Sequence, residues 1–335
     1  MKQLLAAFLG GTLLLAVHAA LAAPVAGLYQ VREPLVQEAD GGREETFSRA
    51  FATLLQRLTG SADSAQKAAL AAYVAKPQSL ALGYTYQEDE LQVSFDPTSV
   101  MRVLREAEMP VWGSERPVIL LWWVQEGLHG RQLLGDGQNR SLNLQQAALH
   151  RGLPTRFPLA DLSEQVRADQ GWLATDEGQL AELLQRYGGD ALLVAETRET
   201  ADGLTGSWEL LGSALKLKGS LIGDNAVMAA DQMFQQLAQE MAREYAVVPG
   251  LGESLQVRLQ RLDLDGMLAA EKALQVFDGK LVFLQGDQAV WQIVALPEQV
   301  RSQLALYGFR ELTSSSGAAI TDEPATALPK LLFAR

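Results

Sequence analysis

The chain has 335 residues, which is enough for two or three domains, and 48% of them are hydrophobic, so each domain can bury a core. Cysteine is absent, which excludes disulfide bonds, thiolate metal sites, a thiol nucleophile and a lipoprotein anchor. The formal net charge of −12 repels phosphate backbones and anionic lipid headgroups, so we expect no nucleic-acid partner.

The start of the chain has the pattern of an export signal. A positive charge at Lys2 precedes an apolar run over Leu4–Val17, and the small residues of Ala20–Ala22 match a signal-peptidase site. We predict that the first 22 residues are a signal peptide cleaved between Ala22 and Ala23. The apolar run is short for a membrane span and no stop-transfer segment follows it. We therefore expect a periplasmic protein with no transmembrane anchor after signal removal. The absence of cysteine in an exported chain favours a bacterial source.

The first unit, residues 23–112, is predicted to be an N-terminal α/β domain. Apolar residues at helical spacing and turn residues between alternating stretches carry the prediction. Asp96 and Pro97 together are typical of a helix start. The patterns indicate a strand over Val25–Val36, a helix over Glu44–Leu58, a helix over Ser64–Val74, and a hairpin of Leu82–Gln87 with Leu91–Phe95.

The second unit, residues 113–249, is predicted to be a central α/β domain. Pro117–Val124 and Asp190–Thr197 are continuous apolar runs, which are typical of strands buried on both faces. We therefore expect a helix-flanked mixed sheet. The remaining patterns predict helices over Leu142–His150, Gln179–Tyr187 and Asp224–Tyr245, and a strand over Ser207–Leu211 that pairs with Ala214–Lys218.

The third unit, residues 250–313, follows a predicted linker at Val247–Gly252. Its patterns read strand, helix, hairpin, helix and strand, ending at Phe309–Leu312, which is the βαββαβ order of a ferredoxin-like fold. Residues 314–335 are predicted to be a mobile tail, with docking of Leu331–Phe333 as an edge strand left open. The whole chain is thus predicted as α/β (α+β), with three consecutive units.

Several short motifs suggest chemistry but are incomplete. Ser64–Lys67 matches the S-x-x-K of penicillin-recognising enzymes, yet the other two motifs of that family are missing, so helix capping explains Ser64 better. Asp263–Gly266 resembles the opening of a calcium loop, but the residues after it have no ligating side chains. The two histidines after the signal, His129 and His150, lie on different predicted elements.

Three other features favour packing or solvent exposure. Trp122 and Trp123 point to opposite faces of their strand, so we interpret them as core residues of two layers. The acids of Glu88–Glu90 lie in a solvated turn, and Gly135–Arg140 is a plain surface loop or a ligand-binding loop. We therefore predict no catalytic, cofactor-binding or metal-binding residues.

Several strings of the chain resemble an uncharacterised bacterial envelope family, domain of unknown function 2066. They are Arg116–Pro117 before the apolar strand, Arg151–Pro154 followed by Pro158–Asp161, and Arg186–Ala191 at the entry of the second buried strand. The resemblance covers most of the chain after the signal. It implies an envelope protein and assigns no activity, cofactor or site residue.

Export and the lack of a catalytic motif favour an interaction or scaffold protein of the cell envelope, with another envelope protein as its partner. A second hypothesis is a binding protein for a small molecule or glycan, which would use the loops after Val124 and Thr197. A third is a hydrolase whose carboxylates come from distant parts of the chain.

Overall fold

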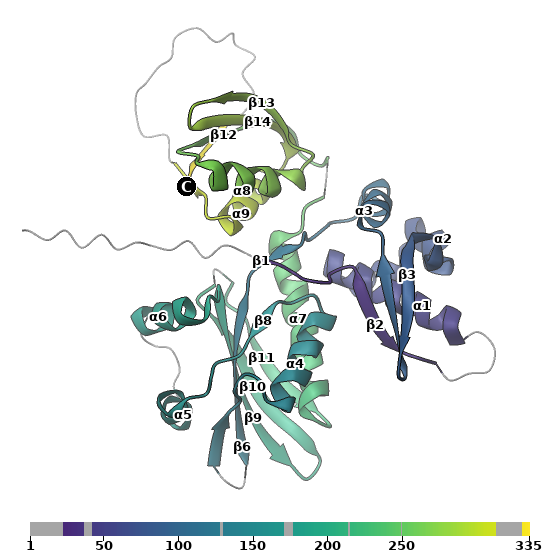
Figure 1. Cartoon of the computed structure of the whole chain (residues 1–335), viewed down its shortest axis with the longest axis vertical. Coiled ribbons are helices and arrows are strands. Elements are labelled where there is room, and N and C mark those ends of the chain that lie inside the picture. The colour runs from purple at the N-terminus through teal and green to yellow at the C-terminus, as the bar shows by residue number, and fades with distance from the viewer. Residues whose placement is uncertain are drawn as a thin grey trace, which may run out of the picture.

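The computed structural model describes residues 23–36, 42–127, 130–170, 177–213, 215–248, 250–312 and 330–335. Helices and mixed or antiparallel sheets alternate along them, which confirms the predicted α+β class (Figure 1). The predicted signal peptide, Ala22 included, lies outside the described residues. Strand β1 (Ala23–Pro24) begins at the residue that the predicted cleavage leaves first, and it pairs with β5 (Glu115–Arg116).

The N-terminal part packs one long helix on a small antiparallel sheet. Helix α1 (Gly42–Thr59) buries Phe47, Phe51 and Leu54 against the sheet, whose strand order is β2–β4–β3. The predicted helix over Ser64–Val74 is broken into short turns, because the chain there has few apolar residues at helical spacing. The elements are β2 (Gln30–Pro34), η1 (Ser64–Gln66), η2 (Ala68–Leu70), α2 (Ala71–Ala75), η3 (Pro77–Leu80), β3 (Ala81–Gln87), β4 (Glu90–Phe95) and α3 (Pro97–Glu106).

The central part is the predicted helix-flanked mixed sheet. Trp123 is buried among residues of α4 and α7, while Trp122 is buried on the opposite face with α5 and α6 (Figure 1). The strand order is β11–β10–β9–β6–β7, and β8 also pairs with β6. The elements are β6 (Ile119–Gly127), β7 (Gly130–Leu133), α4 (Asn139–His150), β8 (Thr155–Arg156), α5 (Leu162–Asp169), α6 (Glu177–Tyr187), β9 (Ala191–Thr200), β10 (Gly203–Leu211), β11 (Lys218–Gly223) and α7 (Ala226–Tyr245).

The last strand of the central sheet differs from the prediction. The sequence suggested that Ala214–Lys218 pairs with β10. Leu217 does accept a backbone hydrogen bond from Leu210 at 2.8 Å, and Ala214 lies outside the described residues, but the strand that pairs with β10 runs over Lys218–Gly223. Gly219 explains this register, because a Cβ at that position would lie 2.7 Å from Nε1 of Trp208. The register also buries Leu221, which is 1% exposed. Close packing of the glycine on the indole therefore decides the pairing.

The third part keeps the predicted element order but not the predicted sheet. Helices α8 (Leu264–Gln275) and α9 (Pro297–Leu306) cover a sheet of order β13–β14–β12–β16–β15 (Figure 1). In a ferredoxin-like sheet the fourth strand would lie beside the first. Here β16 takes that place, and β15 pairs with β16 instead. The strands are β12 (Glu253–Gln260), β13 (Lys280–Gln285), β14 (Gln288–Ala295), β15 (Arg310–Glu311) and β16 (Lys330–Ala334).

For residues 330–335 the structure therefore corrects the prediction of a mobile tail over residues 314–335, while residues 314–329 lie outside the described residues. Strand β16 is parallel to β12 and antiparallel to β15, so it lies inside the sheet rather than at an edge. Leu331 and Phe333 are buried in the core of the third part. Burial of these two apolar side chains offsets the entropy that a chain end loses when it is ordered.

Candidate functional site

A cleft of about 870 Å³ lies between the N-terminal and central parts. Strand β2 forms one wall, and helices α4 and α7 form the other. The walls carry partly exposed apolar side chains, such as Leu142 and Val227, and amide side chains such as Asn143 and Gln146. Such a mixture of apolar surface and a few polar groups is typical of a site for a small molecule.

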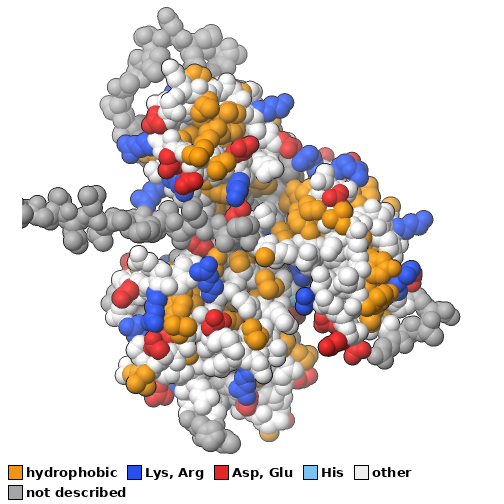
Figure 2. Space-filling view, in the orientation of Figure 1, with side chains coloured by type: hydrophobic (Ala, Val, Ile, Leu, Met, Phe, Trp, Pro, Cys, Tyr) orange, Lys and Arg blue, Asp and Glu red, His pale blue; other side chains and the backbone are white. Residues whose placement is uncertain are grey.

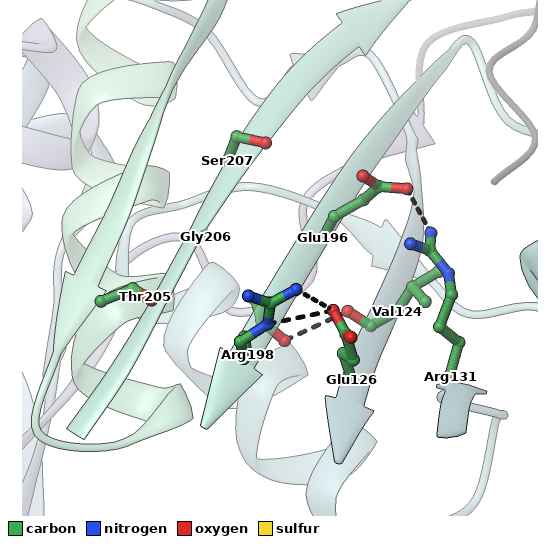
Figure 3. Close-up of a pocket in the computed structure, with 9 residues that line it drawn as sticks. Val124, Glu126, Arg131, Glu196, Arg198, Thr205, Gly206 and Ser207 are labelled. Atoms are coloured by element: carbon green, nitrogen blue, oxygen red, sulfur yellow. Dashed lines mark hydrogen bonds and ion pairs between the residues drawn. The ribbon is translucent and has the colours of Figure 1, made fainter. Parts of the chain in front are cut away.

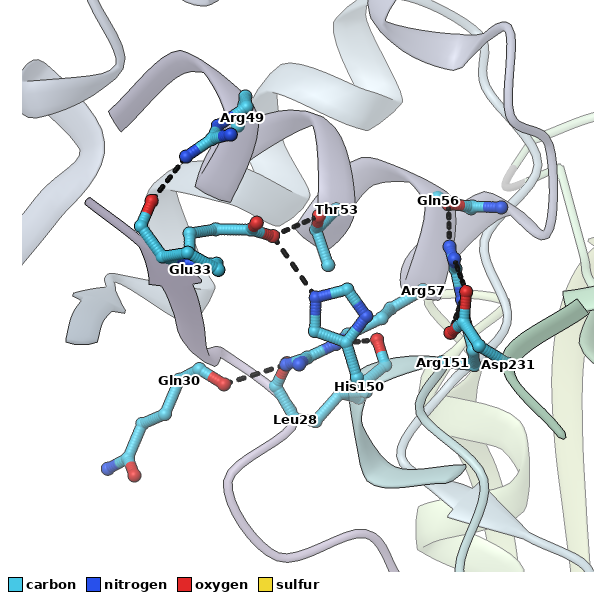
Figure 4. A network of polar contacts seen from close by, with 11 residues as sticks. Leu28, Gln30, Glu33, Arg49, Thr53, Gln56, Arg57, His150, Arg151 and Asp231 are labelled. Carbon is cyan, nitrogen blue, oxygen red and sulfur yellow. Dashed lines mark hydrogen bonds and ion pairs between the residues drawn. The ribbon is translucent and has the colours of Figure 1, made fainter. Parts of the chain in front are cut away.

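A carboxylate and a histidine meet at the base of this cleft (Figure 4). Glu33 of β2 accepts a hydrogen bond from Oγ1 of Thr53 at 2.6 Å, and Nε2 of His150 lies 3.1 Å from the same carboxylate oxygen. Burial raises the pKa of Glu33, but the hydrogen bonds from His150 and Thr53 outweigh burial and hold the pKa below its usual value. The ionised form of Glu33 is therefore favoured in the folded protein.

Arg57 places a buried positive charge beside this pair. Its Nε donates to the carbonyl oxygen of His150 at 2.8 Å, and its Nη1 donates to those of Leu28 at 3.2 Å and Gln30 at 2.7 Å. Burial lowers the pKa of Arg57 to about 10, although the charge of Glu33 acts in the opposite direction. The guanidinium stays protonated at neutral pH, and it joins helix α1 to the end of α4.

An ion pair between Arg151 and Asp231 lies at the other end of the network. Arg151 donates from Nε and Nη2 to the two carboxylate oxygens of Asp231, at 2.7 and 2.5 Å, and from Nη1 to Gln56 at 2.8 Å (Figure 4). Two parallel bonds of this kind fix orientation as well as distance. The contact connects α1 with α7, so the base of the cleft is also the junction between two parts of the protein.

The histidine and the carboxylate of the cleft invite comparison with a catalytic pair. The pairing of His150 with Glu33 resembles a base and the group that orients it. A covalent mechanism would also need a nucleophile within reach of the histidine. Among the described residues that line the cleft, none carries a hydroxyl or thiol group. The arrangement can contact a polar molecule through amide side chains of the walls, such as Asn143 and Gln146, because these are not tied up in the network below them.

A second hollow, of about 310 Å³, lies on the open part of the central sheet (Figure 3). Its charges are paired with one another: Arg198 donates to Glu126 at 2.7 and 3.1 Å, and Arg131 contacts Glu196. Because each charge already has a partner, this surface has less to offer a ligand than the cleft. Val124 and Thr197 lie here within β6 and β9, not before loops as the sequence suggested.

The residues of the incomplete motifs have structural roles. Ser64 is buried, and its Oγ lies 2.5 Å from Oγ1 of Thr59, while Lys67 is exposed, so the S-x-x-K string forms no site. Asp263 caps helix α8 by accepting a bond from the amide of Gly266 at 2.7 Å. Within the described ranges, no three His, Cys, Asp or Glu residues are placed to hold a metal ion.

The predicted ligand-binding loop does not contribute to the cleft, and one of the two histidines cannot be placed. The predicted loop over Gly135–Arg140 ends in the start of α4, and Arg140 donates to Gln125 at 2.8 Å rather than into the cleft. His129 lies outside the described residues. His150 is the one sequence candidate that the structure places in the cleft.

Sequence reasoning missed the partners of His150. Arg57 stands on the apolar face of α1, next to Leu54 and Leu58, and Glu33 shares the inward face of β2 with Val31. A charged residue at a position that the pattern assigns to the core is the signal that could have found them, because buried charges need partners.

A family model for a domain of unknown function, DUF8605, matches residues 22–113, which carry Glu33 and Arg57. The match supports an uncharacterised family, and the domain it names is a different one from domain of unknown function 2066. All of the strings that carried the resemblance to domain of unknown function 2066 lie beyond residue 113, and they mark strand entries and helix ends, which many folds share. No curated protein matches the chain.

Proposed function

We propose that this protein is exported to the bacterial periplasm and acts there as a scaffold that binds another protein of the cell envelope. One observation carries the proposal: in edge strand β13, the four consecutive side chains of Leu281–Leu284 are 44–56% exposed. Monomeric proteins rarely leave a contiguous apolar surface on a strand at the edge of a sheet, since it invites association. Figure 2 shows apolar side chains gathered on the third part, which carries this strand.

Export is supported by the charged and apolar pattern of the first residues. Among the described residues, no helix is long and apolar enough to cross a membrane. Mass spectrometry of the protein from its native cells should give Ala23 as the first residue. A mature protein that keeps Met1 would contradict export by this signal.

Crosslinking in intact cells tests the scaffold function. A lysine-reactive crosslinker should trap the protein with the same envelope protein in repeated experiments, and mass spectrometry should locate the linked residues. Recovery of the uncrosslinked monomer alone, at native abundance and with an efficient reagent, would contradict a scaffold.

A second candidate function, binding of a small polar molecule, is favoured by the 870 Å³ cleft. Val227 of α7 lines the cleft and is 40% exposed, so a Trp at this position would extend into the cleft and fill part of it. A ligand found in a thermal-shift screen should therefore stabilise the natural protein and leave the Val227→Trp variant unchanged. Equal stabilisation of both proteins would place the ligand elsewhere.

A further inference from the structure

A groove of about 440 Å³ runs beside the exposed strand of the third part. Helix α8 forms one wall with Met267 and Leu268, and Leu281 of β13 forms the other. Trp291 of β14, which is 2% exposed, lies at the bottom. The groove is therefore an apolar channel between a helix and the edge strand of a sheet.

A β-bulge in β13 places two of its four apolar side chains on the side of the sheet that carries this groove. The register places Leu281 opposite Trp291 and Leu284 opposite Ala289, with a shift between Leu281 and Phe283. Trp291 and Ala289 both belong to the core under α8, so both leucines stand on the helix side of the sheet. Bulges of this kind redirect side chains at sheet edges.

The backbone of β13 determines what kind of chain fits the groove. Within the described residues, β13 pairs with β14 alone. The N–H and C=O groups of every second residue of β13 therefore point away from the sheet and are free to pair with another strand. An extended segment satisfies such an edge with a ladder of main-chain hydrogen bonds, and its alternate side chains enter the neighbouring groove. A helix would fill the groove but leave the edge unpaired.

The charges indicate the composition of that segment. Glu271 lines the groove and is exposed, whereas Lys272, beside it, lies 3.9 Å from Glu115. Among the described residues, Glu271 is the groove-lining charge for which no ion pair forms, and a basic side chain would complement it. A second copy of this chain fits less well, because two molecules of net charge −12 repel each other.

Building on the proposed scaffold function, we propose that the β13–α8 groove binds an extended segment of the partner protein by strand addition. The segment carries apolar side chains at alternate positions, which contact Leu268, Leu281 and Trp291. It carries a lysine or arginine near Glu271. Specificity comes from the groove, and the strand edge contributes affinity for any extended backbone.

Selection from a random 12-residue peptide library on the purified protein tests this geometry. Enriched peptides should show apolar residues at every second position and a basic residue near one end. Methylation of single backbone nitrogens should then weaken binding at least tenfold at alternate positions and less than twofold at the positions between. Apolar spacing of three and four residues, or indifference to methylation, would overturn strand addition.

A variant pair locates the binding surface. Leu268→Asp should weaken peptide binding at least tenfold, since Leu268 is 50% exposed in the groove wall. Ile222→Asp is the matched control, because Ile222 is 64% exposed on β11, another edge strand. Equal effects of both variants would overturn the assignment. If Leu268→Asp unfolds, the methylation pattern on the natural protein still decides.

The experiments can contradict the proposed scaffold function and the proposed binding groove independently of each other. A partner crosslinked in cells at residues far from α8 and β13 would leave the scaffold function standing and overturn the groove. Peptides that follow the predicted pattern without any partner in cells would do the reverse. A dimer in sedimentation experiments that Leu268→Asp dissociates would assign the groove to a second copy, and would overturn the partner proposed here.

Discussion

Replacement of Arg116 by Met should loosen the junction between the N-terminal and central parts. Arg116 is fully buried, and its guanidinium donates to four carbonyl oxygens: those of Gly113 at 3.0 Å, Gly152 at 2.9 Å, Arg57 at 2.6 Å and Trp112 at 3.1 Å. It also lies 3.9 Å from the centre of the Trp112 ring. These carbonyls come from three separate segments, so one side chain holds them together.

The expected loss follows from two opposing effects. Each hydrogen bond from a charged donor contributes about 1.5–3 kcal/mol, and Met restores none of the four. Burial of the charge costs several kcal/mol, which the variant recovers. Burial, together with nearby Arg57, lowers the pKa of Arg116 to about 9, so the side chain is still charged at neutral pH. We expect a net loss of about 3–5 kcal/mol, because each buried carbonyl oxygen left without a donor costs about 1–3 kcal/mol and recovery of the burial cost offsets part of the sum.

Urea unfolding followed by tryptophan fluorescence and circular dichroism measures this loss. At a slope of about 2 kcal/mol/M, the midpoint should fall by about 2 M. Arg198→Met is the control, since Arg198 is largely exposed, and it should stay within about 0.5 kcal/mol of the natural protein. If Arg116→Met changes the free energy of unfolding by less than about 1 kcal/mol, the four carbonyls do not depend on this donor and the reasoning fails.

Two further changes probe the same junction. The folded protein lowers the pKa of Glu33 from 4.5, so its contribution is present above that pH and is lost as pH falls through the folded value. Glu33→Gln should therefore flatten the acid side of a stability-against-pH profile, and an unchanged profile would contradict the role of Glu33. Gly60 has a φ of +71°, and a Cβ there would lie 2.0 Å from that of Ala242 in α7. Gly60→Ala should cost about 2–5 kcal/mol in thermal unfolding. Gly250→Ala, which has a positive φ but open space, should cost clearly less.

The elements that the sequence predicts well are those whose pattern is local. Helix α1 has apolar residues on one face in every turn. The continuous apolar runs of β6 and β9 identify strands that are covered on both faces of the sheet. The pairing of β11 was predicted only at its start, around Lys218, because the rest of the strand packs Gly219 on Trp208, a contact that periodicity does not contain. Local order was predictable, and the choice between registers was not.

The candidate cleft could be predicted only in part, since its residues come from distant segments. His150 is 117 positions from Glu33 along the chain, and Arg151 is 80 positions from Asp231. No spacing rule joins such residues, because the fold brings them together. A charged residue on an apolar helix face, such as Arg57, still indicates that the folded protein supplies a buried partner for the charge.

The C-terminal strand gives the sharpest contrast between sequence and structure, and Phe333 tests it. Phe333 is 1% exposed on β16, between Leu259 of β12 and Glu311 of β15. Phe333→Ala should therefore lower the stability of the third part by about 3–5 kcal/mol, through lost burial and the cavity left behind. Leu332→Ala is the control on the same strand, since Leu332 is only partly buried and should cost about 1 kcal/mol. Hydrogen exchange of the amides of β12 reports the loss directly, because β16 covers one edge of that strand. A mobile tail would instead leave both variants with the exchange rates of the natural protein, and that result would remove β16 from the sheet.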